Sequence, residues 1–334
     1  MGKIRTNLVY GNPRYEICAV CDVDLDAAKQ MAELYSTIAF QDFKDVIQYY
    51  ELETNLANNN DSNTANANLD AVIISVSTRF HGDYIRQAAK YKLAVFVEKP
   101  VAESPQEIEE LYTMCESQGV PLCCGFQRRF DKSYVAAAEA VQQGEIGQAI
   151  SAHIFFGDSP GPPLEFLITG GNIFFDLSVH DVDFIRWALN DNIASVYAKG
   201  TSSSDELRQH NVQDNATMMM TTTKGSIVTL TMSRRAAYGY DQRCEIFGDQ
   251  GKVFVGNEFD TTTITSNRTG DHWSRLKNSY DSRFREAFVN ELNAFVDTVL
   301  EQKPWPVAKE DVIIVQQVAS AAKESLETDR VVQL

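Results

Sequence analysis

Residues 70–98, DAVIISVSTRFHGDYIRQAAKYKLAVFVE, decide the fold of this chain. The segment opens with an apolar run over 70–76, continues into a helix that begins near Phe80, and ends in a second apolar run over 93–97. Continuous apolar strands are typical of parallel sheets, whose strands are buried on both faces. A strand, a helix and a second strand in this order predict one unit of such a sheet.

The same pattern extends on both sides of this segment. Repetition of strand and helix predicts an α/β fold with a doubly wound parallel sheet. A Ser-Pro-Gln-Glu sequence is typical of a capped helix start with proline in the first turn. The further elements that we predict are strands over 16–22, 36–40 and 120–124, and helices over 25–35 and from Ser104.

The sequence changes character after Gly125. Clean alternation of apolar and polar residues over 228–233 predicts an antiparallel strand with one buried and one wet face. Later segments look similar, and two helices close the chain. We therefore predict two domains, 1–125 and 126–334, of which the second is an α+β domain with a largely antiparallel sheet. An Asn-rich stretch over 55–68 is interpreted as a disordered surface insertion in the first.

The composition excludes some classes of partner. The chain holds 46 Asp and Glu against 30 Lys and Arg, a net charge of −16. Nucleic acids and anionic membranes need basic patches, so neither is expected as a partner. No apolar run approaches the roughly 20 residues of a spanning helix, and no signal-peptide core follows Met1. Cys18 and Cys21 lie three apart in a strand and point to opposite faces, so we expect reduced thiols, no metal site and a cytoplasmic protein.

Two residues near the amino terminus suggest a dinucleotide site. Asp22 ends the strand over 16–22, where an acidic residue can accept both ribose hydroxyls and favours NAD over NADP. Gly2 precedes Asp22 by about 20 residues, the spacing between a phosphate loop and this acidic residue. The alternative for Asp22 is a turn or helix-capping role, as Asp24 and Asp26 nearby illustrate.

Glu98-Lys99-Pro100 directly follows a buried strand. Ligands of open α/β sheets bind beyond the carboxyl ends of the strands, so Lys99 is expected in the ligand crevice. A lysine there could hydrogen-bond a reacting oxygen and stabilise negative charge as a hydride leaves. An ordinary surface lysine is the alternative.

The segment GGNIFFDLSVHD over 170–181 places Asp176 and His180 four residues apart, on one face of a helix. Asp176 can then hold His180. Histidine titrates near neutrality and suits a base that takes the hydroxyl proton while an alcohol is oxidised. A solvated polar face, or a core histidine with a carboxylate partner, is the alternative.

Together these motifs resemble the Gfo/Idh/MocA oxidoreductases over nearly the whole chain. Residues 158–165 and 238–243 look most like the myo-inositol 2-dehydrogenase branch. The resemblance implies a Rossmann-like first domain, NAD as cofactor, a small polyol or sugar as substrate, and oxidation of myo-inositol to 2-keto-inositol. It also implies a homo-oligomer, a dimer or a tetramer.

The resemblance assigns roles to particular residues. Lys99, Asp176 and His180 form the catalytic set. Arg128 and Tyr240 are suggested substrate contacts, although Arg128 could instead form a structural ion pair and Tyr240 could be a core aromatic. The residues expected to bind the cofactor are Gly2, Asp22, Thr78, His81, Glu98 and Lys99.

The amino terminus departs from the family pattern. The family starts with a strand and Gly-x-Gly-x-x-Gly, of which only the third glycine, Gly2, is present. Because that strand is central in the sheet, we expect its neighbours to lose a partner. Either the start is misassigned or the product is impaired, with weak NAD binding. The alternative functions are a non-catalytic nucleotide-binding regulator and a dehydrogenase of another sugar, and the sequence does not give the epimer.

Overall fold

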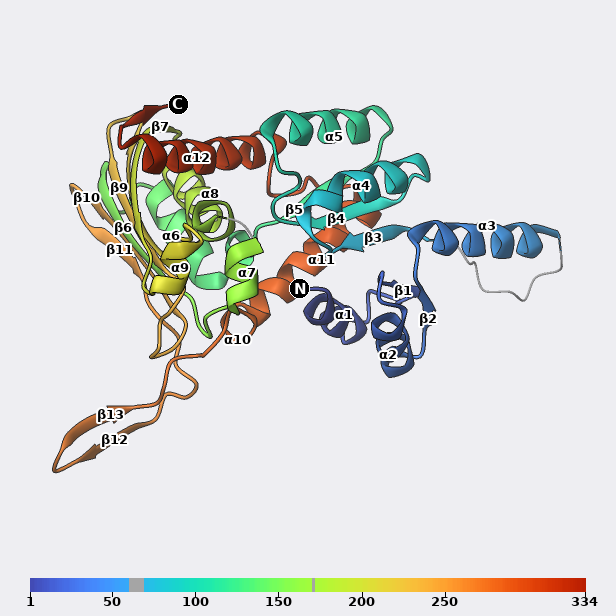
Figure 1. The fold of residues 1–334 in the computed structure, drawn as a ribbon, viewed down its shortest axis with the longest axis horizontal. Coiled ribbons are helices and arrows are strands. Elements are labelled where there is room, and N and C mark those ends of the chain that lie inside the picture. Colours follow the sequence, from blue (N-terminus) through green and yellow to red (C-terminus); the bar gives the residue numbers. More distant parts are fainter. Residues whose placement is uncertain (60–68, 170–171) are drawn as a thin grey trace. The chain divides into compact units, whose positions relative to one another are not determined.

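The computed structural model describes residues 1–59, 69–169 and 172–334, and the chain divides into two compact units (Figure 1). Unit 1 comprises Met1–Gly125 and Phe288–Lys309, and unit 2 comprises Phe126–Ala287 and Glu310–Leu334. The chain first passes from unit 1 to unit 2 after Gly125. The segment 288–309, predicted in the second domain, instead belongs to unit 1, because Phe295 packs there against Phe96.

Unit 1 alternates strands and helices along most of its length. The helices predicted from 25, from near Phe80 and from Ser104 begin at or next to those residues. Asp24 caps the first of them by accepting the amide hydrogens of Asp26 and Ala27. The elements are α1 (Gly2–Tyr10), β1 (Ala19–Cys21), α2 (Leu25–Tyr35), β2 (Ile38–Phe40), α3 (Phe43–Asn59), β3 (Ala71–Ile74), a 3-10 turn (Thr78–Phe80), α4 (His81–Lys90), β4 (Ala94–Glu98), α5 (Pro105–Ser117) and β5 (Leu122–Gly125).

The parallel strands of unit 1 form two sheets rather than one. β1 pairs with β2, and β3, β4 and β5 form a second sheet with β4 in the centre. The α/β class and the parallel pairing are confirmed. Among the described residues no strand pairs with the second edge of β1 or of β3.

The predicted insertion over 55–68 differs in part from the structure. Residues 55–59 are helical, because α3 begins at Phe43 and continues to Asn59. Its first turns are anchored by the buried side chains of Val46 and Ile47, and each further residue then adds one backbone hydrogen bond at little cost. Residues 60–68 lie outside the described residues.

Unit 2 is built on a sheet of seven strands in the order β11-β10-β6-β9-β8-β7-β14. Only the β6–β9 pair in this sheet is parallel, which confirms the largely antiparallel prediction. The strands are β6 (Ala149–Gly157), β7 (Ile193–Thr201), β8 (Asn215–Thr222), β9 (Ile227–Ser233), β10 (Asp241–Gly248), β11 (Lys252–Val255) and β14 (Val332–Gln333).

Helices cover one face of this sheet. α6 (Lys132–Gln142), α8 (Val179–Leu189) and α12 (Lys309–Thr328) lie on the same side, as Figure 1 shows. Burial alternates strictly along β8, where Met218 and Met220 are buried and Met219 is 49% exposed. A hairpin of β12 (Ile264–Asn267) and β13 (Gly270–Trp273) extends away from the sheet (Figure 1).

The remaining helices are short or join these parts of the chain. They are the turn Gln127–Phe130, α7 (Leu164–Thr169), a π-helical turn (Phe174–Ser178), α9 (Asp205–Gln209), α10 (Tyr280–Arg283) and α11 (Arg285–Glu301). Across the described ranges, every helix is too short or too polar to cross a membrane.

Candidate active site

The amino terminus of α1 offers the first part of a cofactor site in unit 1. α1 begins at Gly2, where a Cβ atom would meet only the Ser75 Cβ at 3.9 Å, so the backbone is open to approach. The Ser75 hydroxyl, just beyond β3, is buried and has no hydrogen-bond partner within the described residues. Backbone N–H groups at a helix start attract anions. An open glycine beside an unsatisfied hydroxyl fits a polar cofactor group.

Asp22 follows β1, at the carboxyl end of that strand. Its side chain is exposed and its Oδ1 accepts the Asp24 amide hydrogen at 2.9 Å. This is the turn contact that the sequence left open as an alternative. It engages one carboxylate oxygen and keeps the group at the surface, where a ribose could reach it.

Lys99 directly follows β4, whose last residue is Glu98. The Arg5 guanidinium donates from Nε to Glu98 Oε1 at 2.7 Å. Glu98 therefore forms a largely buried ion pair with Arg5 of α1. This contact joins the end of β4 to the helix. Lys99 itself is half-buried.

The loop after β3 carries the two other predicted cofactor residues. Thr78 is half-buried at the start of the short 3-10 turn. His81 is 1% exposed and begins α4. Its Nδ1 lies 2.8 Å from the Pro100 carbonyl oxygen and its Nε2 lies 3.0 Å from that of Val76. His81 therefore contacts the backbone of two loops.

In unit 2, Asp176 lies in the π-helical turn that precedes α8. Turns of this kind occur often at functional sites. Asp176 Oδ2 accepts a hydrogen bond from Arg234 Nη1 at 2.6 Å, and the Arg234 side chain is only 2% exposed. The predicted glycines at 170 and 171 lie outside the described residues.

His180 is the second residue of α8 and is half-buried. Its ring centroid lies 6.2 Å from that of Phe126 and 6.4 Å from that of Phe156. Aromatic rings in contact have centroids about 4.5–7 Å apart, so both rings lie within contact range of the imidazole. The helix start thus presents a half-buried histidine beside two aromatic rings.

Sequence reasoning missed Arg234, although a signal for it exists. Val228, Leu230 and Met232 are fully buried along β9, and the same period of two places Arg234 on the buried face. A buried guanidinium needs a carboxylate partner, and that partner is Asp176. The alternation that identified the strand could therefore have identified the residue.

The two suggested substrate contacts lie inside unit 2. Arg128 is 1% exposed, forms an ion pair with Asp181, donates to Gln242 and stacks over Tyr134. Burial lowers the pKa of Arg128, but the Asp181 carboxylate outweighs it, so the net direction is upward. The structure favours a structural ion pair, one of the two roles that the sequence allowed.

Tyr240 is also buried, 4% exposed, and packs edge-on against Phe156 and Phe284. Burial raises the pKa of Tyr240 well above its ordinary value. The hydroxyl therefore stays protonated, and the geometry favours the core aromatic that the sequence held as the alternative.

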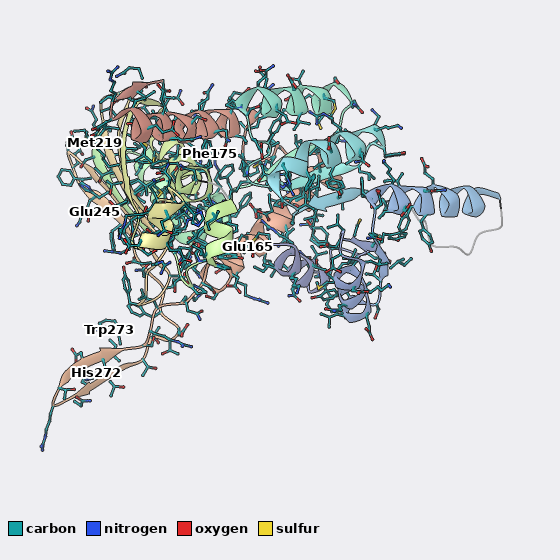
Figure 2. All side chains as sticks on the ribbon, viewed as in Figure 1. Glu165, Phe175, Met219, Glu245, His272 and Trp273 are labelled. Carbon is teal, nitrogen blue, oxygen red and sulfur yellow. The ribbon has the colours of Figure 1, made fainter. Side chains whose placement is uncertain are left out.

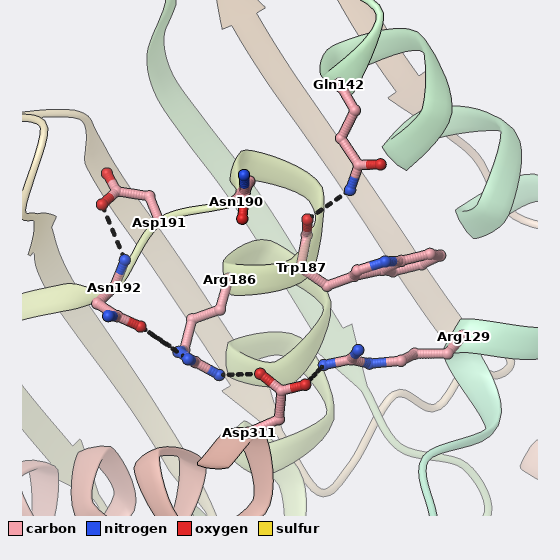
Figure 3. Close-up of a pocket in the computed structure, with 8 residues that line it drawn as sticks. All are labelled: Arg129, Gln142, Arg186, Trp187, Asn190, Asp191, Asn192 and Asp311. Carbon is pink, nitrogen blue, oxygen red and sulfur yellow. Dashed lines mark hydrogen bonds and ion pairs between the residues drawn. The ribbon is translucent and has the colours of Figure 1, made fainter. Parts of the chain in front are cut away.

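A polar pocket of about 250 Å³ opens elsewhere in unit 2 (Figure 3). Arg129 and Arg186 both donate to the Asp311 carboxylate, at 2.8 and 3.0 Å, so their charges are already compensated. Among the described residues that line it, none belongs to the predicted catalytic set. The pocket carries no chemistry for the predicted reaction.

Comparison with known proteins identifies the family. Residues 1–126 match the oxidoreductase family with an NAD-binding Rossmann fold, GFO/IDH/MocA, and residues 134–254 match the GFO/IDH/MocA C-terminal domain. The chain is 34% identical to the myo-inositol 2-dehydrogenase of Thermotoga maritima over 268 residues, 80% of each chain. It is 28% identical to the inositol 2-dehydrogenase of Rhizobium meliloti over 337 residues, covering 100% of this chain and 96% of the relative.

A solved structure extends the similarity to three dimensions. The scyllo-inositol dehydrogenase of Lactobacillus casei, crystallised with NAD(H) and scyllo-inositol, superposes with a TM-score of 0.89 at 26% identity. The superposition covers 99% of this chain and 95% of that one. Both the family matches and the relatives span the two units, so the chain belongs to the GFO/IDH/MocA family of NAD-binding oxidoreductases.

Proposed function

We propose that this protein oxidises a secondary hydroxyl of a cyclic polyol with NAD, converting myo-inositol to 2-keto-inositol. The observation that carries the proposal is the similarity to inositol dehydrogenases across both units, together with the retained Lys99, Asp176 and His180. Oxidation of an alcohol to a ketone removes one hydride and one proton. NAD supplies the hydride acceptor when it is bound.

Residues of unit 2 take up the proton. His180 accepts the hydroxyl proton, and Phe126 and Phe156 hold its ring in a water-restricted setting. Asp176 favours the protonated imidazole that results. Arg234 fixes Asp176 from the buried side of the sheet, so the carboxylate approaches the histidine from a set direction.

Unit 1 supplies the cofactor contacts and a donor to the substrate oxygen. Lys99 donates a hydrogen bond to that oxygen and stabilises its developing negative charge. Gly2 opens the start of α1 to the pyrophosphate, Asp22 accepts the ribose hydroxyls, and Thr78 and His81 shape the loop near the nicotinamide. Glu98 acts through its ion pair with Arg5.

Arg128 and Tyr240 complete the proposal as residues that support the substrate pocket. Arg128 fixes Asp181 on α8, the helix that carries His180. Tyr240 packs against Phe156, which also faces His180. Both can therefore affect substrate binding without touching the substrate.

The outer face of the unit 2 sheet supports a homo-oligomer, a dimer or a tetramer. Large apolar side chains on this face stay exposed, and Figure 2 shows Met219 on the side away from the helices. An exposed apolar patch on a sheet marks an interface. The exposed residues are Met219, Ile227, Phe247 and Phe254, each between 47% and 59% accessible. The cysteine side chains are all thiols, which supports a cytoplasmic location.

A panel of polyols tests the proposed function directly. The purified chain is mixed with NAD and with myo-inositol, scyllo-inositol, glucose or sorbitol, and NADH formation is followed by absorbance. We expect turnover with an inositol and little with the open-chain sorbitol. Turnover with glucose alone would instead establish a sugar dehydrogenase. NAD binding without turnover of any polyol would favour the non-catalytic regulator.

A further inference from the structure

The residues on either side of Lys99 are each held by a buried side chain. Glu98, before it, accepts from Arg5 Nε at 2.7 Å. Pro100, after it, has its carbonyl oxygen 2.8 Å from His81 Nδ1. We propose that Arg5 and His81 are positioning residues that fix Lys99 from both sides. This inference rests on the proposed function of Lys99 as the donor to the reacting oxygen.

Arg5 links three elements of unit 1. From α1 it pairs with Glu98 on β4 and, through Nη2, with Glu291 on α11 at 2.7 Å. Its guanidinium also lies 4.6 Å from the centroid of the Phe96 ring. Burial lowers the pKa of Arg5, but the two carboxylates raise it by more, so the charge persists. Separating the two charges would leave one of them buried without a partner, which is strongly destabilising. The ion pair therefore holds the Glu98 carboxylate next to Arg5.

The end of β5 is shaped to leave room for this arrangement. A Cβ atom on Gly125 would lie 3.4 Å from Arg5 Nη2 and 3.5 Å from Glu291 Oε1. It would also come within 3.0 Å of the Phe96 ring. Glycine at the strand end therefore keeps space for the Arg5 guanidinium beneath the sheet edge.

His81 joins the two loops that follow β3 and β4. Its Nε2 faces the Val76 carbonyl oxygen at 3.0 Å while Nδ1 faces that of Pro100. A carbonyl oxygen only accepts, so each contact is a hydrogen bond when the ring nitrogen that faces it carries a proton. With 1% of its surface exposed, the ring is enclosed by protein. His81 thereby packs between the Pro100 backbone and the end of β3.

Holding both neighbours limits the movement of the Lys99 backbone. A catalytic group must keep its productive position to within about 0.5 Å. Loss of either contact should therefore lower turnover more than substrate affinity, since Lys99 acts on charge that develops during the reaction. A side chain that served stability alone would lower the melting temperature and leave kcat per folded molecule unchanged.

Two substitutions of His81 separate its two contacts. The amide of His81→Asn can replace Nδ1 and donate to Pro100, whereas that of His81→Gln can replace Nε2 and donate to Val76. We expect the kcat of His81→Gln to lie about 10–100-fold below that of His81→Asn, the effect of misplacing a group by about 1 Å. The KM for polyol should differ little between the two variants. Equal kcat for the two folded variants would overturn the inference.

Arg5 is tested with a matched surface arginine. Arg5→Lys keeps the charge but loses the planar guanidinium, whose Nε and Nη2 contact Glu98 and Glu291 from two separate positions. We expect kcat to fall as in His81→Gln. Arg14→Lys is the control, because Arg14 pairs with Asp297 at the surface of the same unit and should leave kcat unchanged. Normal kcat in folded Arg5→Lys would remove Arg5 from the proposal.

A double-mutant comparison distinguishes failure of this inference from failure of the proposed function. If His81 acts through Lys99, His81→Gln should lower turnover no further in a Lys99→Ala background, because residues that act as a unit are not additive. A further loss equal to that in the wild type would overturn positioning alone. Normal turnover of Lys99→Ala itself would overturn the role of Lys99, and this inference with it.

Discussion

His180 is the residue on which the proposed chemistry depends most. We expect His180→Ala to lower kcat by about 10²–10⁴-fold, the usual contribution of a positioned acid–base group. His272→Ala is the control, since His272 lies on the exposed hairpin (Figure 2) and contacts only Thr269 among the hydrogen bonds found for it. Initial rates with saturating NAD and inositol measure both. A His180→Ala rate within a few-fold of wild type would exclude it as the base.

Asp176 has a separate signature. Asp176→Asn keeps a hydrogen-bond acceptor for Arg234 but removes the charge that favours a protonated His180. We expect the pH profile of kcat to move to lower pH, because the imidazolium loses its stabilising carboxylate. A pH series of initial rates measures the shift, and an unchanged profile would remove Asp176 from the mechanism.

Asp22 decides between the two nicotinamide cofactors. A carboxylate at the ribose repels a 2′-phosphate, so we expect NAD to be preferred. Asp22→Ala should lower kcat/KM for NAD by at least about 10–100-fold, the contribution of a single hydrogen bond to a charged group, and should lessen discrimination against NADP. Asp26→Ala, an exposed acid on the adjacent helix, is the control. A lower KM for NADP than for NAD in the unaltered chain would refute this placement.

Asp241 makes stability depend on acid pH. Burial raises its pKa, but hydrogen bonds from Arg243, Tyr238 and Asn257 outweigh this, so the pKa lies below its ordinary value. Its contribution is therefore complete above the unfolded value of about 3.9 and is lost as pH falls through the folded value. Asp241→Asn should be less stable at pH 7 and lose less on acidification. The melting temperatures of both proteins are measured between pH 7 and about pH 2. An equal fall in melting temperature for the two proteins would contradict this prediction.

At the scale of elements, the start of α5 shows one half of the predicted cap. Ser104 Oγ accepts the Glu107 amide hydrogen at 3.2 Å, while the Glu107 carboxylate binds Arg86 on α4 at 3.0 Å. A reciprocal capping box would have turned Glu107 back toward Ser104. The ion pair instead joins two helices on the same face of the β3-β4-β5 sheet.

Removal of the cap should weaken the helix measurably. We expect Ser104→Ala to lower the free energy of unfolding by about 0.5–2 kcal/mol, the range for N-cap substitutions. Ser117→Ala serves as the control, because its hydroxyl bonds to Met114 within the last turn of the same helix and caps no amide. Urea unfolding followed by circular dichroism measures both. Equal midpoints would show that the Ser104 cap adds nothing.

At the scale of the whole molecule, the apolar outer face of the unit 2 sheet predicts self-association. Phe247 and Phe254 lie on adjacent strands β10 and β11 and are 47% and 59% exposed. Replacing both with Asp should reduce the mass in light scattering after size exclusion to that of one chain, since two charges would have to be buried. Leu300→Lys, an exposed apolar residue of unit 1, should not change it. If the doubly substituted protein remains oligomeric, the interface lies on another surface.

The sequence by itself determined most of the strand–helix order of unit 1, although not the helix α3, and the alternation of unit 2. Both follow from periods of two and 3.6 residues, which are local properties of the chain. The positions of Asp22, Lys99 and His180 at element ends followed from the same periods.

Only the tertiary structure decided which distant residues meet. It placed 288–309 in unit 1, because Phe295 fills that core, and it paired Arg234 with Asp176 across 58 positions of sequence. It also paired Arg5 with Glu98 across 93 positions. Ion pairs of this kind depend on which buried charges come within reach, and no local period encodes that. The sequence was enough to predict the chemistry of single residues, whereas the contacts that position those residues were seen only in the folded structure.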